Sequence, residues 1–443
     1  MDSPETEDLY GAVHAVEQEI VSRKAIRQIA IYFLLVMLFY ILGSPGPSSI
    51  AYIPIQFYLK DRLHFTPEQT SRFFFWAGVP LYVGFLFGYL RDRWKPFGKG
   101  DRAYLFISPL AISAGYFWLA LRPITYNGLL FATFLSTGFG VLLGATIQGL
   151  MTQVAQRNAM AGRLSVIVMV TTNVPSIIAP TAGGWLSDHR SPQFTFYLAS
   201  TLALVVTLMT LWRPHAVFSH EHVSEETKPE AGGESALNIK SVKEILKQLR
   251  KPSLYLPAAI MFLWNFSPGW GTPLTYYMTN TVKLTVEQYG SFGSIQNFTM
   301  FVVAGVYLLL CRRFKLKRLL WLGTFLGVLG APLLLLIHGW TAAVCVAIFV
   351  GTANSIAISA YYDLLMRACP KSLEAAMFML GAGMFALASA SSDVFGSWLF
   401  DRGGFGLALL VTAILTALVL PLLQFLPRHL VDYRDGELHT DPH

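Results

Sequence analysis

Charged residues are scarce in this sequence. They make up 13% of its 443 residues, whereas a soluble domain carries roughly 25%. Apolar residues account for 54% of the chain, and the mean hydropathy is +0.49. A water-soluble core of this length could not bury so many Phe, Leu and Val side chains. The composition therefore excludes an ordinary soluble domain and indicates that a lipid bilayer surrounds most of the chain.

Cysteine and clustered titratable side chains are also scarce. The three cysteines, Cys311, Cys345 and Cys369, have no paired spacing, so the sequence predicts neither a disulfide framework nor a metal motif. The ten histidines fall in loops, helix ends and tails. A phosphate-binding glycine loop followed by Lys-Ser or Lys-Thr is absent. We therefore expect no metal, no cofactor and no direct use of ATP, and a membrane enzyme or a receptor is a weak alternative.

Long apolar runs are abundant. A membrane-spanning helix needs roughly 20 predominantly apolar residues, and twelve runs of this kind can be read from the sequence. They lie near residues 28–59, 71–91, 103–121, 127–155, 163–187, 193–213, 253–282, 289–311, 317–337, 340–366, 373–399 and 405–426. The sequence therefore predicts an all-α integral membrane protein with twelve transmembrane helices.

Basic residues are distributed unevenly between the loops. If both termini are cytoplasmic, the cytoplasmic segments hold 26 Lys and Arg residues and the loops on the other side hold 7. Basic loops favour the cytoplasm, so this split predicts a cell (inner or plasma) membrane protein with both termini inside. The polar N-terminal segment lacks the basic start and apolar core of a signal peptide. The net charge of +7 fits loops that face anionic lipid, and we expect no nucleic-acid partner.

A repeat relates the two halves of the chain. Each half carries Ser-Pro-Gly inside a long apolar run, at residues 44–46 and 267–269. An aromatic pair and a Thr-x-Glu-Gln motif follow, and residues 57 and 276, 66 and 285, and 69 and 288 are all 219 apart. Proline and glycine disrupt helices, so the first and seventh helices should kink or unwind there. Many secondary transporters are built from two related halves with broken helices. We predict two pseudo-symmetric six-helix bundles.

The repeat and the loops define the expected domains. These are a cytoplasmic N-terminal segment (1–27), an N-terminal bundle (28–213), a cytoplasmic linker (214–252), a C-terminal bundle (253–427) and a cytoplasmic tail (428–443). Within the linker, residues 239–250 place apolar side chains on one helical face and basic side chains on the rest, which predicts an amphipathic helix on the cytoplasmic leaflet. This helix either tethers the bundles or has a regulatory role.

The loop after the second helix carries alternating charges. Residues 88–102 (GYLRDRWKPFGKGDR) resemble the glycine, aspartate and arginine signature of the major facilitator superfamily. Asp92 would face the capped start of the eleventh helix, forming a cytoplasmic latch. The equivalent loop in the second half lacks the aspartate, and a plain positive-inside loop is the alternative in both. The candidate gating residues are Gly88, Arg91, Asp92, Arg93, Arg102, Arg312 and Glu374.

Four segments resemble the folate–biopterin transporter family. They are residues 57–69 (FYLKDRLHFTPEQ), 88–104, 274–280 (LTYYMTN) and 369–378 (CPKSLEAAMF). This resemblance implies a twelve-helix carrier with the major facilitator fold, in a family associated with pterins and folates. Members usually carry aspartates in helix 4, where this chain has Gln148 and Gln153. Any function that rests on a helix 4 carboxylate is therefore not carried over.

Polar side chains at membrane depth are candidates for substrate binding, because they are costly there. The chain offers neutral amides and hydroxyls beside aromatic rings. Such a lining suits a flat heteroaromatic ring, since amides bind its edge and aromatic rings stack on its faces. Ordinary hydrogen bonding between helices is the alternative for each residue. The predicted substrate-binding residues are Ser44, Ser48, Gln56, Gln148, Asn173, Trp264, Asn265, Trp270, Tyr276, Tyr277, Gln296, Asn297, Asn354 and Tyr361.

Charge at membrane depth is nearly absent. Asp393 lies near the outer end of helix 11, and a buried carboxyl group can take up a proton near neutral pH. It is therefore the best candidate for proton coupling, although an acid reaching towards the lipid headgroups is the alternative. Asp363 is a second candidate and lies four residues before Arg367, with which it could pair. No mid-membrane Lys or Arg is placed to bind the glutamate tail of a folate, which points to a neutral or weakly charged substrate.

The sequence thus predicts a secondary active or facilitative transporter that works by alternating access. Its solute would be small and heteroaromatic, pterin- or folate-like, and protons or another ion would be coupled to it in a symporter. We expect a monomer in the lipid bilayer. The main alternative is a drug exporter or a muropeptide-type permease of the same superfamily.

Overall fold

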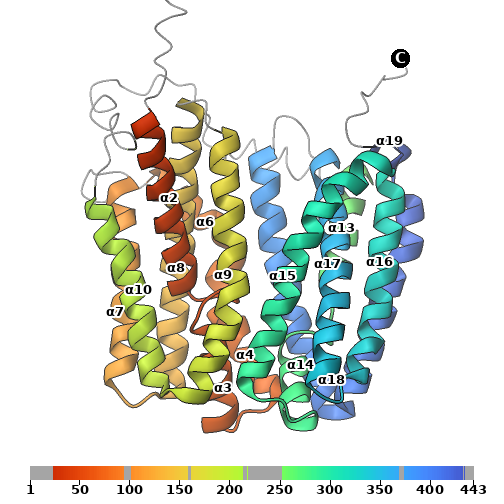
Figure 1. Ribbon diagram of the computed structural model, residues 1–443, viewed down its shortest axis with the longest axis horizontal. Helices are drawn as coiled ribbons and strands as arrows, with labels where there is room; N and C mark the ends of the chain where they lie inside the picture. Colours follow the sequence, from red (N-terminus) through yellow and green to blue (C-terminus); the bar gives the residue numbers. More distant parts are fainter. Residues whose placement is uncertain are drawn as a thin grey trace, which may run out of the picture.

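Helices make up most of the structure, a computed structural model of the 443-residue chain (Figure 1). It describes residues 23–93, 101–157, 161–212, 252–368 and 374–432, together with residues 217 and 434. Among these residues there is no strand. The amphipathic helix predicted at 239–250, residues 1–22 of the N-terminal segment and most of the C-terminal tail lie outside the described residues.

The first half contains six membrane segments. The first begins as α2 (Arg23–Gly43) and, after a non-helical stretch, resumes as α3 (Tyr52–Phe57) and the π-helical turn η1 (Tyr58–Arg62). The second is divided into α4 (Pro67–Ala77), α5 (Val79–Tyr82) and α6 (Gly84–Arg93). The other four are α7 (Asp101–Leu121), α8 (Tyr126–Arg157), α9 (Ala161–His189) and α10 (Pro192–Leu211).

The second half repeats this order. Its first segment is divided into α13 (Pro252–Asn265), α14 (Thr272–Tyr276) and the π-helical turn η3 (Tyr277–Thr281). Then follow α15 (Val286–Arg313), α16 (Leu316–Leu333) with η4 (Leu334–Leu336), and α17 (Trp340–Ala368). The last elements are α18 (Glu374–Leu422), η5 (Leu423–Phe425) and α19 (Arg428–Val431).

These bounds give twelve membrane segments, as predicted. Within the described residues, nine helices are long and apolar enough to cross a membrane. One of them, Gly383–Phe425, is 43 residues long and contains a kink at Gly404 (φ 71°), so it supplies both the eleventh and the twelfth crossing. The interrupted segments 67–93 and 252–281 supply the remaining two.

The first and seventh segments are interrupted at the predicted Ser-Pro-Gly sequences. α2 ends at Gly43 and helix resumes at Tyr52, while α13 ends at Asn265 and α14 begins at Thr272. The second segment is also interrupted, at Gly78, which we did not predict. Pro80 follows in the first turn of α5, and proline has no N–H to continue the helical hydrogen bonds.

The sequence repeat is also a repeat of backbone geometry. Residues 58–62 and 277–281 each form one π-helical turn. His64 (φ 54°) and Lys283 (φ 63°), also 219 apart, are the non-glycine residues with positive φ in the described chain. Thr66 and Thr285 then each form a capping box with the glutamine three residues later. α4 and α15 therefore begin after the same turn in the two halves.

Two bundles lie side by side, one from each half (Figure 1). Among the described residues, buried apolar side chains form one large and one small cluster in the first bundle and two clusters in the second. One face of the molecule holds the start of α2 and the short helix α19, and we call it the terminal face (top of Figure 1). The other face holds the turns at residues 63–66 and 282–285, and we call it the opposite face. Large apolar side chains such as Leu309 (70% exposed) and Phe131 (62% exposed) cover the outside, as expected where lipid is the solvent.

Candidate functional site

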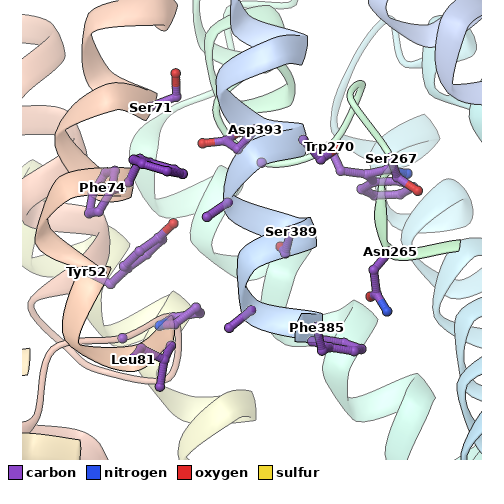
Figure 2. A pocket seen from close by; sticks show the side chains of 18 of the residues that line it. Tyr52, Ser71, Phe74, Leu81, Asn265, Ser267, Trp270, Phe385, Ser389 and Asp393 are labelled. Atoms are coloured by element: carbon purple, nitrogen blue, oxygen red, sulfur yellow. The ribbon is translucent and has the colours of Figure 1, made fainter. Parts of the chain in front are cut away.

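A cavity of about 610 Å³ lies between the two bundles. Its walls come from the first four membrane segments of the first half and from α13, α16, α17 and α18 of the second. Figure 2 shows side chains from α4 on one side and from α18 on the other, with the segment after α13 beside them. Small-molecule pockets measure about 300–1,000 Å³, so the cavity can hold a small organic solute.

Aromatic rings line both sides of this cavity (Figure 2). Tyr52 and Phe74 belong to the first half, and their ring centroids are 4.8 Å apart. Trp270 and Phe385 belong to the second half. Tyr52 and Trp270 lie at or beside the ends of the non-helical stretches, so the helix breaks bring them to the wall. Their flat faces can stack against a heteroaromatic ring.

Asp393 is the single charged side chain among the described residues that line the cavity. Its Oδ1 accepts a hydrogen bond from the backbone N–H of Thr272 at 2.7 Å, and its Oδ2 accepts one from the Thr272 hydroxyl at 2.8 Å. Thr272 is the first residue of α14. Asp393 of α18 therefore holds the point at which the seventh segment resumes its helix.

Gly271 makes this contact possible. Its φ of 76° lies in the region that favours glycine. A Cβ at this position would also lie 2.5 Å from Asp393 Oδ1. The turn before α14 and the close approach of the carboxylate therefore both require a residue without a side chain.

Four of the predicted binding residues line the cavity: Trp264, Asn265, Trp270 and Asn354. Asn265 is held by a hydrogen bond from its Nδ2 to the Met261 carbonyl oxygen at 3.0 Å. Asn354 is half-buried on α17. Together with Asp393, these residues give the cavity amides, rings and one acid, which can bind the edge and the faces of a heteroaromatic solute.

Three other predicted residues join the two bundles instead. Gln56 Nε2 donates to Thr275 Oγ1 at 3.0 Å, and these residues are 219 apart, so equivalent positions of the repeat meet. The Tyr276 hydroxyl donates to the Phe65 carbonyl oxygen at 2.6 Å. Asn297 Nδ2 donates to a backbone carbonyl of α9 at 2.8 Å. These side chains hold the bundles together beside the cavity or towards the opposite face.

The remaining predicted residues lie outside the cavity lining. Ser48 shares a hydrogen bond with Ser176 of α9 at 2.7 Å, and the Tyr277 ring stacks on Phe405 with centroids 4.2 Å apart. Tyr361 is buried in the second bundle, where its hydroxyl is 2.6 Å from that of Thr324. The others are Ser44, Gln148, Asn173 and Gln296.

The predicted cytoplasmic latch can be followed only in part. The side chains of Asp92, Arg93 and Glu374 lie outside the described residues, so the latch stays a prediction. Arg91 forms a bidentate pair with Asp101, with Nε–Oδ1 at 2.8 Å and Nη2–Oδ2 at 2.7 Å. This pair joins the end of α6 to the start of α7. The other candidate gating residues are Gly88 in α6, Arg102 in α7 and Arg312 in the last turn of α15.

The second candidate for proton coupling already has a basic partner. Arg367 Nε donates to Asp363 Oδ1 at 2.8 Å, and its Nη2 donates to Oδ2 at 3.0 Å. The pairing expected from the spacing of four residues is therefore confirmed. Asp363 is absent from the lining of the cavity, whereas Asp393 is part of it.

Several lining residues were not predicted. Tyr52, Phe74 and Tyr82 come from the first two segments, and Thr412 and Thr416 come from the end of α18. One signal was available, the run of four aromatic residues at 73–76. It could not be interpreted, because a lipid-facing helix is also rich in such residues. The helix break beside this run was not visible either, since glycine is common in membrane helices.

Solved transporter structures share the fold. The chain is similar to a POT family transporter in complex with 5-aminolevulinic acid, with a TM-score of 0.69 and 15% identity over 91% of this chain and 96% of that one. It is also similar to a mutant form of the nucleoside transporter NupG, with a TM-score of 0.63 and 13% identity over 90% of this chain and 99% of that one. These likenesses show the major facilitator fold.

Relatives in sequence agree with this fold. The chain is 24% identical over 417 residues to the folate-biopterin transporter of Synechocystis sp. (strain ATCC 27184 / PCC 6803 / Kazusa), a match that covers 88% of this chain and 80% of that protein. The profile of the BT1 family matches residues 46–440. The predicted family resemblance is confirmed, and the chain is a multi-pass membrane transporter of a small organic solute, not an enzyme. The chain belongs to the BT1 family.

Proposed function

We propose that this transporter carries a pterin- or folate-like heteroaromatic solute through the cavity between its bundles. The observation that supports this substrate class is the lining, in which aromatic rings from both halves surround Asn265, Asn354 and Asp393. Rings can stack on the faces of a heteroaromatic solute, and amides can both donate to and accept from its edge. The curated relative is a folate-biopterin transporter, which favours the same class.

Within this class, neutral or weakly charged solutes suit the lining best. The described residues of the wall include Asp393 but no Lys, Arg or His. A solute with a glutamate tail would bring carboxylates into a cavity without a basic partner, and burying an unpaired charge is costly. Unconjugated pterins should therefore bind more tightly than folates.

Transport is proposed to occur by alternating access, with the bundles 28–213 and 253–427 rocking about the cavity. The distribution of Lys and Arg favours a terminal face in the cytoplasm and a location in the inner or plasma membrane. In the described structure the bundles are joined by hydrogen bonds beside the cavity and towards the opposite face, such as Gln56–Thr275. This arrangement supports the proposal of a state closed to the outside. A monomer suffices, because one chain supplies both walls.

Asp393 is the proposed proton-coupling group. Its carboxylate lies in the wall of the cavity and its described hydrogen-bond partner is the neutral residue Thr272. Asp363 is matched by Arg367. Protonation of Asp393 would remove an acceptor at the start of α14, so the proton state and the seventh segment are linked through one contact.

Ligand binding to the purified transporter tests the substrate class. A thermal-shift screen against pterins, folates, nucleobases and amino acids should show stabilisation by pterins. Asn354→Ala should weaken that stabilisation. Thr352→Ala, two residues earlier on α17, serves as the matched control, because Thr352 is not in the lining and its hydroxyl bonds to its own helix.

Uptake then tests transport itself. Proteoliposomes should take up labelled pterin with saturation, and unlabelled pterin should compete. No saturable uptake, together with drug resistance on expression, would instead favour an exporter of amphipathic compounds. Stabilisation by amino acids or nucleobases alone would reject the pterin-like class while leaving the transporter fold in place.

A further inference from the structure

Two carboxylates at the opposite face each bind the start of a helix in the other bundle. Asp401 of α18, in the second bundle, accepts a hydrogen bond at Oδ2 from the backbone N–H of Glu68 in α4, at 3.2 Å. Asp188 of α9, in the first bundle, accepts one at Oδ2 from the backbone N–H of Glu287 in α15, at 2.8 Å. The exchange is reciprocal, because each bundle supplies one carboxylate and one helix start.

The repeat relates these two contacts. Glu68 and Glu287 are 219 apart and hold the same position, two residues after the threonine that begins each capping box. Asp188 lies at the end of the fifth membrane segment, and Asp401 lies at the end of the eleventh, six segments later. Figure 1 shows α9 beside α15 and α4 low between the two bundles. Both contacts are therefore of the same kind, at the two sides of one interface.

A small residue lies one helical turn before each of the two carboxylates. Four residues before Asp188 is Gly184, where a Cβ would lie 2.7 Å from the Val286 carbonyl oxygen of α15. Four residues before Asp401 is Ser397, which is fully buried. A larger side chain at Gly184 would separate α9 from α15, and one at Ser397 would have no free space. The carboxylate that follows would then no longer reach its N–H.

Charge strengthens these contacts without making them permanent. The N-terminus of a helix carries a partial positive charge, so a carboxylate there is stabilising by about 0.3–1 kcal/mol at an exposed site. Each helix start also keeps its own capping box, from Thr66 or from Thr285. When the bundles part, the released N–H can bind water while the helix stays capped. The contact can therefore form and break in every cycle.

We propose that Asp188 and Asp401 are a matched pair of positioning residues that hold the opposite face closed during alternating access. This inference rests on the proposed rocking of the two bundles, but it does not depend on the identity of the solute. Arg402 Nη1 lies 3.7 Å from Glu68 Oε2 at the same interface, so the α4 side has one additional attraction. Loss of either carboxylate shifts the transporter towards the state that is open at the opposite face.

Cysteine accessibility measures this shift. Ser389→Cys places a reporter in the cavity, after the native cysteines have been replaced by alanine. A membrane-impermeant maleimide is added to full-length protein in two preparations of sealed vesicles, one for each orientation of the protein. From the opposite face, Asp188→Ala and Asp401→Ala should each raise the labelling rate about two- to fivefold. The double variant should show about the product of the two increases, and labelling from the terminal face should fall.

Asp61→Ala is the matched control. Asp61 is an exposed acid at the same face, and its described ion-pair partner is the adjacent Lys60, at 3.2 Å. Its loss should leave the labelling rate unchanged. Unchanged labelling in the double variant overturns the proposal, and so does an equal increase in Asp61→Ala, which would indicate a general effect of surface charge. Asp401→Asn, which keeps an oxygen acceptor, should fall between wild type and Asp401→Ala if the variants are folded. Because labelling needs no solute, this result can still be interpreted if the substrate assignment is wrong.

Discussion

Asp393→Asn tests the coupling role of the acid in the cavity. Asparagine has nearly the same shape as aspartate, but it keeps one acceptor oxygen and replaces the other by a donor. The asparagine oxygen can keep the bond from the Thr272 N–H and its Nδ2 can donate to the Thr272 hydroxyl, so the two charge-assisted contacts, at 2.7 Å and 2.8 Å, become neutral hydrogen bonds. A hydrogen bond to a charged group contributes about 1.5–3 kcal/mol, and a neutral amide is less costly to bury, so we expect a net loss of about 1–2 kcal/mol in the free energy of unfolding.

The effect on accumulation should be larger. A carrier that moves one proton with each solute can accumulate that solute about tenfold for each pH unit across the membrane, because a tenfold ratio corresponds to about 1.4 kcal/mol. An asparagine side chain does not take up or release a proton at the pH values of such a gradient. Asp393→Asn should therefore equilibrate the solute without accumulating it, while exchange continues. Proteoliposomes with an imposed pH gradient measure accumulation, and counterflow in the same vesicles measures exchange.

Asp363→Asn is the control for this experiment. It removes a carboxylate from α17 that is paired with Arg367 and is not part of the cavity lining. Accumulation should stay close to the wild-type ratio. If Asp393→Asn accumulates solute as the wild type does, Asp393 is not the coupling group. If the variant loses both exchange and accumulation, Asp393 is instead assigned to solute binding and the coupling role is refuted.

Three further substitutions separate packing from function. Gly184→Ala should destabilise the described state by about 1–3 kcal/mol, because the new Cβ would lie 2.7 Å from the Val286 carbonyl oxygen. Gly305→Ala on α15 is the control, because nothing lies within 4 Å of the new Cβ, and it should be neutral or stabilising by about 0.5–1 kcal/mol. Equal melting temperatures for Gly184→Ala and Gly305→Ala would contradict the packing argument. Tyr361→Phe removes the hydrogen bond to Thr324 and should lower the free energy of unfolding by about 1 kcal/mol. Ligand affinity should be unchanged. A tenfold loss of affinity would place Tyr361 in the site.

The sequence was sufficient for the fold, because its signals are local. Twelve apolar runs give twelve crossings in a bilayer, where every backbone polar group must be paired within a helix. The Ser-Pro-Gly interruptions and the repeated Thr-x-Glu-Gln motif likewise act within a few residues of themselves. They predicted the breaks at 44–51 and 266–271.

The site was only partly accessible to the same reasoning. Asn265, Asn354 and Asp393 stood out, because an amide or an acid is conspicuous among apolar residues. Tyr52 and Phe74 did not, since an aromatic ring at membrane depth can face lipid, core or cavity. Gln56 was assigned to the solute, yet it bonds to Thr275 in the other bundle. Polarity predicted that such a side chain needs a partner, but not which partner.

The amino-acid order by itself determined the number of crossings, the two related halves and the places where helices break, since each of these depends on neighbouring residues. Tertiary packing decided which rings line the cavity, and it also decided that Asp188 and Asp401 bind helix starts in the bundle to which they do not belong. Those pairings join residues roughly 100 and 330 positions apart. They depend on how two complete bundles meet, and no periodicity within either half carries that information.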